Sequence, residues 1–186
     1  EEFVFTAGLI YPYRGLEDQI EAWYRSREYD NLPPLVVAGK IGQGMRAYYR
    51  KLIRMLEEKQ LTERVHFLGV LSEGEMAWCY QNCVAFVVSS RVEACPNIVL
   101  EALAHGCICV VADNPPLPEF CVDTALYYPP GRSTILEKKL REIIGWTNEH
   151  RHRVSVRAAA QASTFTWDAC CEGTIRELRK SIGQGY

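Results

Sequence analysis

Short apolar runs alternate with longer amphipathic stretches along almost the whole chain. The apolar runs have the length of strands, contain β-branched residues and are bounded by glycine, proline or polar positions, a pattern typical of strands buried on both faces of a parallel sheet. Strands are predicted at residues 3–7, 34–38, 65–69, 84–88, 107–112 and 125–128.

The amphipathic stretches between these runs have the spacing of helices. The first of them buries Leu16, Ile20, Ala22 and Trp23 on one face, and Ser72 with Glu75 forms a capping box at the start of another. Helices are predicted at residues 15–27, 45–59, 72–81, from Pro96, at 135–146 and 152–162, and from about 167.

Regular alternation of strand and helix implies parallel pairing through right-handed crossovers. The expected fold is therefore α/β, a Rossmann-like doubly wound parallel sheet with helices on both faces. Ligands of such sheets bind outside the carboxyl ends of the strands. Three polar turns meet at that edge, residues 8–15, 39–44 (glycine-rich) and 89–97, and one ligand could touch all three.

The turn after the fourth strand combines two chemical features. Pro96 suits the first helical position and Cys95 before it is a poor N-cap, so backbone amides at this helix start are expected to be free to bind an anion. Glu93 lies in the turn, and Glu101 lies among apolar residues of a helix expected to be buried, where ribose or sugar hydroxyls would satisfy it. The alternative is a solvated stripe of Asn97, Glu101 and His105.

Composition limits the classes of function. The chain has 186 residues, 48% of them hydrophobic, and a formal net charge of -2, which suits one globular domain and gives no electrostatic case for binding nucleic acid. No apolar run has the length of a membrane span. Because the sequence lacks an initiator Met and starts directly in a strand, we expect a fragment of a longer protein.

The eight cysteines mostly lie within apolar strand or helix patterns, and no Cys-x-x-Cys pair occurs. We interpret them as free thiols packed like small hydrophobic residues in a reducing compartment, the cytoplasm. Cys79 and Cys83 could share a helix face and bind a metal, but no second pair is spaced to complete the site, so no metal site is predicted.

The motif Glu93-Ala-Cys-Pro-Asn-Ile-Val-Leu-Glu101-Ala-Leu-Ala-His-Gly106 resembles the two-glutamate motif of retaining GT-B glycosyltransferases, especially family 4. The segments at 8–17, 65–72, 118–119 and 165–167 also resemble that family, so the similarity covers nearly the whole chain. The resemblance implies that residues 1–186 form the carboxyl-terminal, nucleotide-sugar-binding half of a GT-B fold. The final helix from about 167 would then pack toward a missing amino-terminal domain.

The resemblance also implies roles for individual residues. Glu93 and Arg14 would be catalytic, with Arg14 neutralising charge on the leaving diphosphate, and Glu101 would hold the ribose. The backbone near Leu71 would line the base, and Gly8 belongs to the first donor-site loop. One turn would contact the donor sugar and the distal phosphate, mainly through its backbone amides. This turn consists of Ala94, Cys95, Pro96 and Asn97.

The family resemblance implies that a hexose is transferred from a nucleoside-diphosphate sugar without a cofactor or metal. The donor expected first is a UDP-sugar, and the second is GDP-mannose. The isolated fragment is expected to be inactive because the acceptor site belongs largely to the missing domain. Leu9 replaces an arginine that is frequent in the family, which favours the alternative of a non-catalytic binding or scaffold module; a related GT-B epimerase or phosphorylase is a further alternative.

One predicted helix has a basic face. It consists of Arg46, Arg50, Lys51 and Arg54, and its simplest interpretation is a solvated surface. The alternative is peripheral contact with an anionic membrane, at the cytoplasmic face, in the full-length protein.

Overall fold

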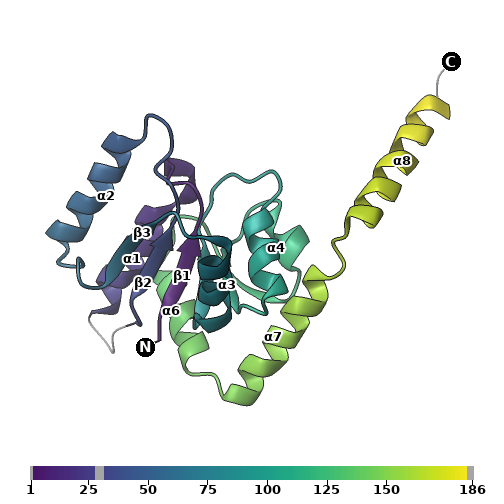
Figure 1. Ribbon diagram of the computed structural model, residues 1–186. Coiled ribbons are helices and arrows are strands. Elements are labelled where there is room, and N and C mark those ends of the chain that lie inside the picture. The colour runs from purple at the N-terminus through teal and green to yellow at the C-terminus, as the bar shows by residue number, and fades with distance from the viewer. Residues whose placement is uncertain (1, 28–31, 184–186) are drawn as a thin grey trace.

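The computed structural model describes residues 2–27 and 32–183; the predicted domain limits at residues 1 and 186 lie outside this part. Its centre is a six-stranded, wholly parallel sheet with strand order β3-β2-β1-β4-β5-β6 (Figure 1). The strands are β1 (Val4–Ala7), β2 (Leu35–Ala38), β3 (Val65–Gly69), β4 (Ala85–Val88), β5 (Cys109–Ala112) and β6 (Ala125–Tyr128).

Helices follow the strands in alternation, as predicted, and cover both faces of the sheet. Helix α1 packs against α6 and α2, whereas α4 packs against α5 and α7, so the two groups form separate layers. The helices are α1 (Leu16–Ser26), α2 (Arg46–Glu58), α3 (Glu73–Asn82), α4 (Asn97–Ala104), α5 (Leu117–Cys121), α6 (Ser133–Ile144), α7 (Asn148–Ala162) and α8 (Trp167–Gly183). The predicted doubly wound α/β fold is confirmed.

The hydrophobic core runs through the middle of the sheet. Every residue of the central strands β4 and β5 is buried, because helices cover both of their faces. On one side of the sheet the core is closed by Trp23 of α1, which is 1% exposed and donates its indole N–H to the carbonyl of Pro33 at 2.9 Å. The capping box predicted at Ser72 and Glu75 is present at the start of α3.

Several predicted boundaries were wrong. A 3₁₀ helix occupies Pro12–Arg14 within the predicted loop, and α5 begins inside the turn predicted at residues 113–119. Pro96 is not the first residue of α4. Its φ of -80° and ψ of 66° make it the centre of an inverse γ-turn, in which the amide of Asn97 donates to the carbonyl of Cys95 at 2.9 Å, so the helix begins one residue later.

Two glycines allow the loops at the carboxyl edge to pack backbone against backbone. A Cβ on Gly39, whose φ is +144°, would lie 1.8 Å from the carbonyl oxygen of Gly8. A Cβ on Gly15, whose φ is +65°, would lie 2.3 Å from the carbonyl oxygen of Ser89. Both distances are impossible for a side chain, so these approaches require glycine.

Helix α8 extends away from the remainder of the molecule (Figure 1). Its apolar residues Trp167, Ile175, Leu178 and Ile182 are exposed, with Trp167 at 84%. Whether this helix packs toward another domain, as expected from the sequence, stays a prediction. Among the residues described, no helix combines the length and the apolarity needed to cross a bilayer.

Substitution of Gly15 by alanine should destabilise the fold much more than the same change at Gly44. Both glycines have a left-handed φ, +65° and +74°, but a Cβ at Gly44 has no atom within 4 Å. We expect Gly44→Ala to lower the free energy of unfolding by about 1 kcal/mol, the cost of the left-handed conformation. Gly15→Ala should lower it by roughly 3 kcal/mol or more, because the carbonyl of Ser89 must move. Urea denaturation compares the two variants, and equal losses would contradict this account.

Candidate functional site

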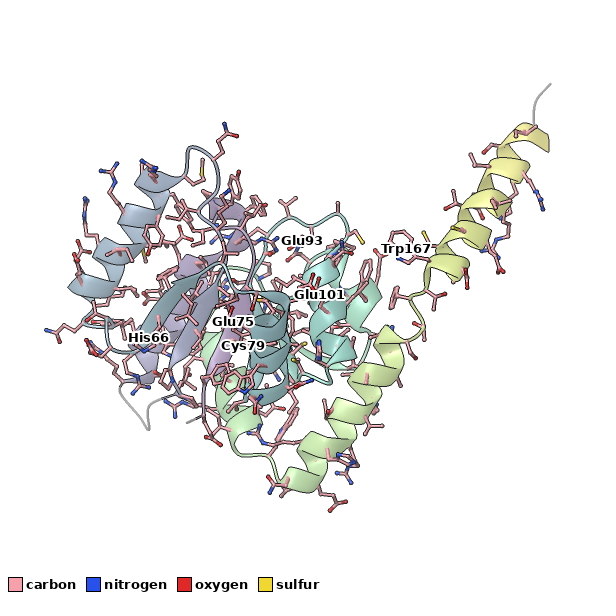
Figure 2. The ribbon with its side chains drawn as sticks, in the orientation of Figure 1. His66, Glu75, Cys79, Glu93, Glu101 and Trp167 are labelled. Atoms are coloured by element: carbon pink, nitrogen blue, oxygen red, sulfur yellow. The ribbon has the colours of Figure 1, made fainter. Side chains whose placement is uncertain are left out.

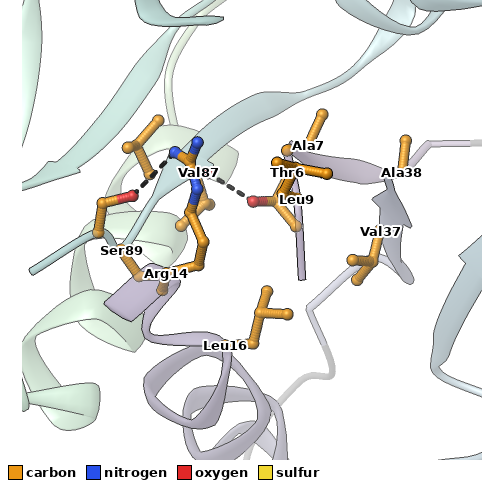
Figure 3. A pocket seen from close by; sticks show the side chains of 12 residues that line it. Thr6, Ala7, Leu9, Arg14, Leu16, Val37, Ala38, Val87 and Ser89 are labelled. Atoms are coloured by element: carbon orange, nitrogen blue, oxygen red, sulfur yellow. Dashed lines mark hydrogen bonds between the residues drawn. The ribbon is translucent and has the colours of Figure 1, made fainter. Parts of the chain in front are cut away.

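The first loop places Arg14 directly against the turn that follows β4. Its guanidinium donates from Nη1 to the Glu93 carboxylate at 2.5 Å and to the Ser90 hydroxyl at 3.2 Å. The side chains of Arg14 and Glu93 are only 19% and 9% exposed. Figure 3 shows Arg14 beside Thr6, Val87 and Ser89, in a hollow at the ends of β1 and β4. Two residues predicted to be catalytic are thus in contact.

Gly8 gives the guanidinium its space. A Cβ on Gly8 would lie 3.2 Å from Cζ of Arg14, and the φ of +130° at this residue also favours glycine. The Nε atom of Arg14 is buried and has no hydrogen-bond partner among the described residues. A buried N–H group without a partner is costly, so an oxygen atom of a ligand would satisfy it well.

A buried polar network holds this arrangement in place. Gln19 on α1 donates to the Ser89 hydroxyl at 2.7 Å and to the Thr6 hydroxyl at 3.2 Å. Ser89 donates in turn to the carbonyl of Arg14 at 2.6 Å, and Thr6 donates to the carbonyl of Val87 at 2.8 Å. The sequence interpretation assigned no role to these residues, because serine, threonine and glutamine in a strand or helix have no distinguishing pattern.

A second set of contacts fixes the turn from its other side. The amide of Arg91 donates to the carbonyl of Tyr13 at 2.7 Å, and its guanidinium lies 3.2 Å from the buried carboxylate of Asp18. Asp18 also accepts from the amide of Gly131 at 2.8 Å. The turn that contains Glu93 is therefore tied to the first loop, to α1 and to the segment after β6.

The amides at the start of α4 differ from those expected. Pro96 has no N–H group, and the amide of Asn97 is used within the inverse γ-turn, so neither can bind an anion in this structure. No described residue accepts from the amides of Ala94, Cys95 and Ile98. The free amides therefore come from the exposed turn and the second residue of the helix.

Glu101 is exposed, contrary to the buried position expected from its apolar neighbours. Only one side of α4, with Val99, Ala102 and Leu103, packs into the core. The Glu101 carboxylate accepts a hydrogen bond at 3.1 Å from the hydroxyl of Tyr80 on α3. Burial, together with the charge of Glu101, raises the pKa of Tyr80 well above its usual value, which keeps this hydroxyl a donor.

Glu93 and Glu101 both belong to the α4 region, Glu93 in the loop that precedes the helix (Figure 2). No hydrogen bond joins Glu101 to Arg14 or Glu93, so within the described residues the site has two separate carboxylate positions. Asn97 is exposed, and its side chain accepts from the Cys95 thiol at 3.3 Å. The solvated polar stripe considered as an alternative agrees with these exposures.

A wider groove lies at the ends of β2 and β3. Its volume is about 1010 Å³, enough for a small organic ligand, and its walls include the glycine-rich turn at 39–44 and Val70. Leu71 is half-buried and packs against the core instead of lining the groove with its side chain. Leu9 is 45% exposed next to the Arg14 hollow.

All eight cysteines are free thiols. Cys79, Cys107, Cys109 and Cys121 are buried, and burial raises the pKa of Cys121 to about 12. Cys83 is the C-cap residue of α3, and among the described residues no group of three or more His, Cys, Asp or Glu side chains is placed to hold a metal.

The sequence matches the model of one known protein family. A sequence model of the family described as glycosyl transferases group 1 matches residues 1–161. No curated protein matches the sequence.

Many solved structures share the fold. HepE from Anabaena, solved with UDP and glucose, superposes with a TM-score of 0.80 at 20% identity over 96% of this chain and 48% of its own. Sucrose-phosphate synthase from Thermosynechococcus elongatus gives 0.81 at 21% identity, over 100% and 46%. The catalytic domain of a cholesterol-α-glucosyltransferase from Helicobacter pylori gives 0.75 at 19%, over 89% and 99%. The chain thus spans about half the length of the first two proteins.

The contact between Arg14 and Glu93 should be energetically coupled. Because both side chains are largely buried, removing one partner leaves the other charge desolvated, so we expect a coupling energy of about 1–3 kcal/mol in a double-mutant cycle. The cycle uses Arg14→Gln and Glu93→Gln, measured by urea denaturation.

The matched control is the exposed pair of Glu149 and Arg153, whose side chains are 81% and 63% exposed. Its coupling should not exceed about 0.5 kcal/mol. Additive effects at Arg14 and Glu93 would show that their contact does not exist in solution.

Proposed function

The chain belongs to the glycosyl transferases group 1 family, and we propose that it is the donor-binding domain of a retaining, family 4 glycosyltransferase. The full-length enzyme would move a hexose from a nucleoside-diphosphate sugar to an acceptor. The observation that supports this proposal best is the position of Arg14. Its guanidinium lies over Gly8 at the carboxyl edge of the sheet, with a buried Nε that has no described partner.

The proposed ligand of Arg14 is the diphosphate. A phosphate oxygen beside the guanidinium would satisfy Nε and form a charge-assisted hydrogen bond. The free amides of Ala94, Cys95 and Ile98 would supply further donors at the start of α4, where the helix dipole favours negative charge. Together they would stabilise the charge that develops on the leaving group, which is the main catalytic contribution that we propose. This arrangement requires no metal.

The two glutamates have different proposed roles. Glu93, held by Arg14, would contact the donor sugar, and its carboxylate would position the guanidinium for the diphosphate. Glu101 is exposed and accepts only one described hydrogen bond, from Tyr80, so its carboxylate has capacity to hold the ribose hydroxyls. Tyr80 would orient Glu101 for this contact.

For the nucleotide we propose uridine diphosphate first and guanosine diphosphate, from GDP-mannose, second. HepE was solved with UDP and with UDP-glucose, which supports the first choice. The backbone near Leu71 would line the base, since its neighbour Val70 borders the groove at the ends of β2 and β3.

The proposed enzyme needs a second domain. Because the chain spans about half of HepE and of sucrose-phosphate synthase, we propose an amino-terminal GT-B domain that provides the acceptor site. Helix α8, with its exposed Trp167, would pack toward that domain. The chain alone would bind the donor without transferring the sugar. We also propose a cytoplasmic location, which suits the free thiols.

A non-catalytic binding module is the second candidate function. Leu9 favours it, because this exposed residue brings no charge to the place where the family often has arginine. The internal pair of Arg14 with Glu93 would also reduce the charge available to a ligand. A related epimerase or phosphorylase has no specific support in the structure.

Nucleotide binding tests the proposal. Calorimetric titration of the chain with UDP and GDP, without metal, should show saturable binding of one of them. Arg14→Ala and Glu101→Ala should each weaken binding about 10- to 100-fold, because each removes a charged hydrogen-bond partner of the ligand. Bound nucleotide should also slow alkylation of Cys95, the exposed thiol of the turn.

The control variant is Arg153→Ala on the exposed surface of α7, which should leave binding unchanged. Cys170 and Cys171 are exposed on α8 and provide an internal reference for the alkylation rate. Absence of binding, or binding that Arg14→Ala does not weaken, would favour the non-catalytic alternative.

A further inference from the structure

Two thiols meet at the end of α3. Cys83 is the C-cap residue of this helix, Cys107 lies just before β5, and their Sγ atoms are 4.0 Å apart. Both thiols donate to the carbonyl of Tyr80, from 2.9 Å in Cys107 and from 3.6 Å in Cys83. The shared acceptor holds the two sulfur atoms close together, although they are 24 residues apart in the sequence.

The backbone at this helix end explains the two thiol contacts. An α-helix leaves its last carbonyls without intrahelical donors. The amide of Cys83 donates to the carbonyl of Cys79, and the amide of Val84 donates to the carbonyl of Phe3. The S–H groups of Cys83 and Cys107 thus serve the carbonyl of the buried residue Tyr80, so a change at the sulfur atoms changes the surroundings of Tyr80.

The thiol pair can be reached from solvent. A cavity of about 250 Å³ opens between the end of α3, the segment after α4 and α7, and both Cys83 and Cys107 line it. Cys83 is half-buried, whereas Cys107 is 3% exposed. A water molecule occupies about 30 Å³ in the liquid, so the cavity has room for an oxidant as small as hydrogen peroxide.

We propose that Cys83 and Cys107 are a redox-sensitive pair that a peroxide converts into a disulfide. In the first step the Cys83 sulfur attacks the O–O bond and becomes a sulfenic acid, and the released hydroxide leaves as water with the Cys83 proton. In the second step the Cys107 sulfur attacks the Cys83 sulfur, the S–O bond breaks, and the hydroxide leaves as water with the Cys107 proton. The two thiols lose two electrons, and the peroxide gains them.

The surroundings favour this order of steps. The contact with Cys83, together with burial, raises the pKa of the Cys107 thiol, so Cys107 stays protonated until Cys83 has reacted. A metal site would be another use of two thiols, but among the described residues no third ligand side chain is placed to complete one. In the cytoplasm, the location proposed above, disulfides are typically transient and redox-sensing.

The disulfide would affect Glu101 through Tyr80. It removes both S–H donors of the Tyr80 carbonyl, and a buried carbonyl without a donor is costly. It also brings the sulfur atoms closer, since a disulfide bond is only about 2 Å long. The hydroxyl of Tyr80 donates to Glu101 at 3.1 Å, so a shift of Tyr80 would disturb this contact. This consequence rests on the proposed function, in which Glu101 holds the ribose, whereas the disulfide itself does not.

Peptide mapping tests the disulfide. The chain is treated with a small excess of hydrogen peroxide, its remaining thiols are alkylated, and it is digested with trypsin. Cys83 then lies in the peptide of residues 65–91 and Cys107 in that of residues 92–132, because neither peptide contains an internal lysine or arginine. A cross-linked pair of these peptides is expected, and dithiothreitol should separate it.

Single substitutions identify the bonded sulfur atoms, because each peptide holds further thiols. Cys83→Ser and Cys107→Ser should each abolish the cross-link, and circular dichroism confirms that these variants are folded. The control variants are Cys79→Ser, one turn before Cys83 on α3, and Cys95→Ser, the exposed thiol of the second peptide. Both should retain the cross-link. Its loss in either control, or its absence from the unmodified chain, would overturn the proposal.

Nucleotide affinity tests the consequence for Glu101. Calorimetry compares the reduced and the oxidised chain with UDP and GDP. The disulfide should weaken binding about 10-fold, the size expected when a hydrogen bond to a charged group is disturbed. Cys83→Ser treated with the same peroxide should keep its affinity, which separates the disulfide from oxidation of other residues. Tyr80→Phe lacks the hydroxyl, so its affinity should not respond to peroxide.

The possible outcomes distinguish the redox pair from the proposed function. A chain that forms the cross-link but binds neither nucleotide in either state would support the redox pair and contradict the donor site. Equal affinity of the reduced and the oxidised chain would contradict the link through Tyr80. A chain that binds a nucleotide but forms no cross-link would contradict the redox pair and leave the donor site supported.

Discussion

The close contact between the first loop and the end of β4 is the constraint on which the rest of the site depends. Gly15 lies so near the carbonyl of Ser89 that no side chain fits between them. The buried hydrogen bonds of Gln19, Ser89 and Thr6 join the same two segments. Because a buried donor or acceptor without its partner is costly, this network permits few alternative positions of the loop. Arg14, one residue before Gly15, is thereby directed at the turn that contains Glu93.

The electrostatic character of the site follows from that geometry. Arg14 is satisfied in part by Glu93 and Ser90, while its Nε and the amides of Ala94, Cys95 and Ile98 have no described partner. The carboxylate thus orients the guanidinium but does not use all of its donors. A ligand oxygen that reached these donors would complete their hydrogen bonds.

One exposed helical surface lies away from this centre (Figure 1). Helix α8 presents aromatic and aliphatic side chains, among them Trp167, far from the sheet. An apolar helical face suits burial against protein.

The sequence by itself determined the six strands, the helices between them except α5, the parallel α/β fold and the turns at the carboxyl edge of the sheet, because these follow from local periodicity and from the handedness of crossovers. It also singled out Glu93, Glu101 and Arg14 as candidate residues. Only the tertiary structure decided that Arg14 and Glu93, 79 residues apart, form a pair, and that Tyr80 donates to Glu101. It also decided the start of α4, since the γ-turn at Pro96 depends on the backbone conformation of the whole turn. The pairs Arg14–Glu93 and Tyr80–Glu101 join residues far apart in the chain, and no local pattern of hydrophobic and polar positions encodes them.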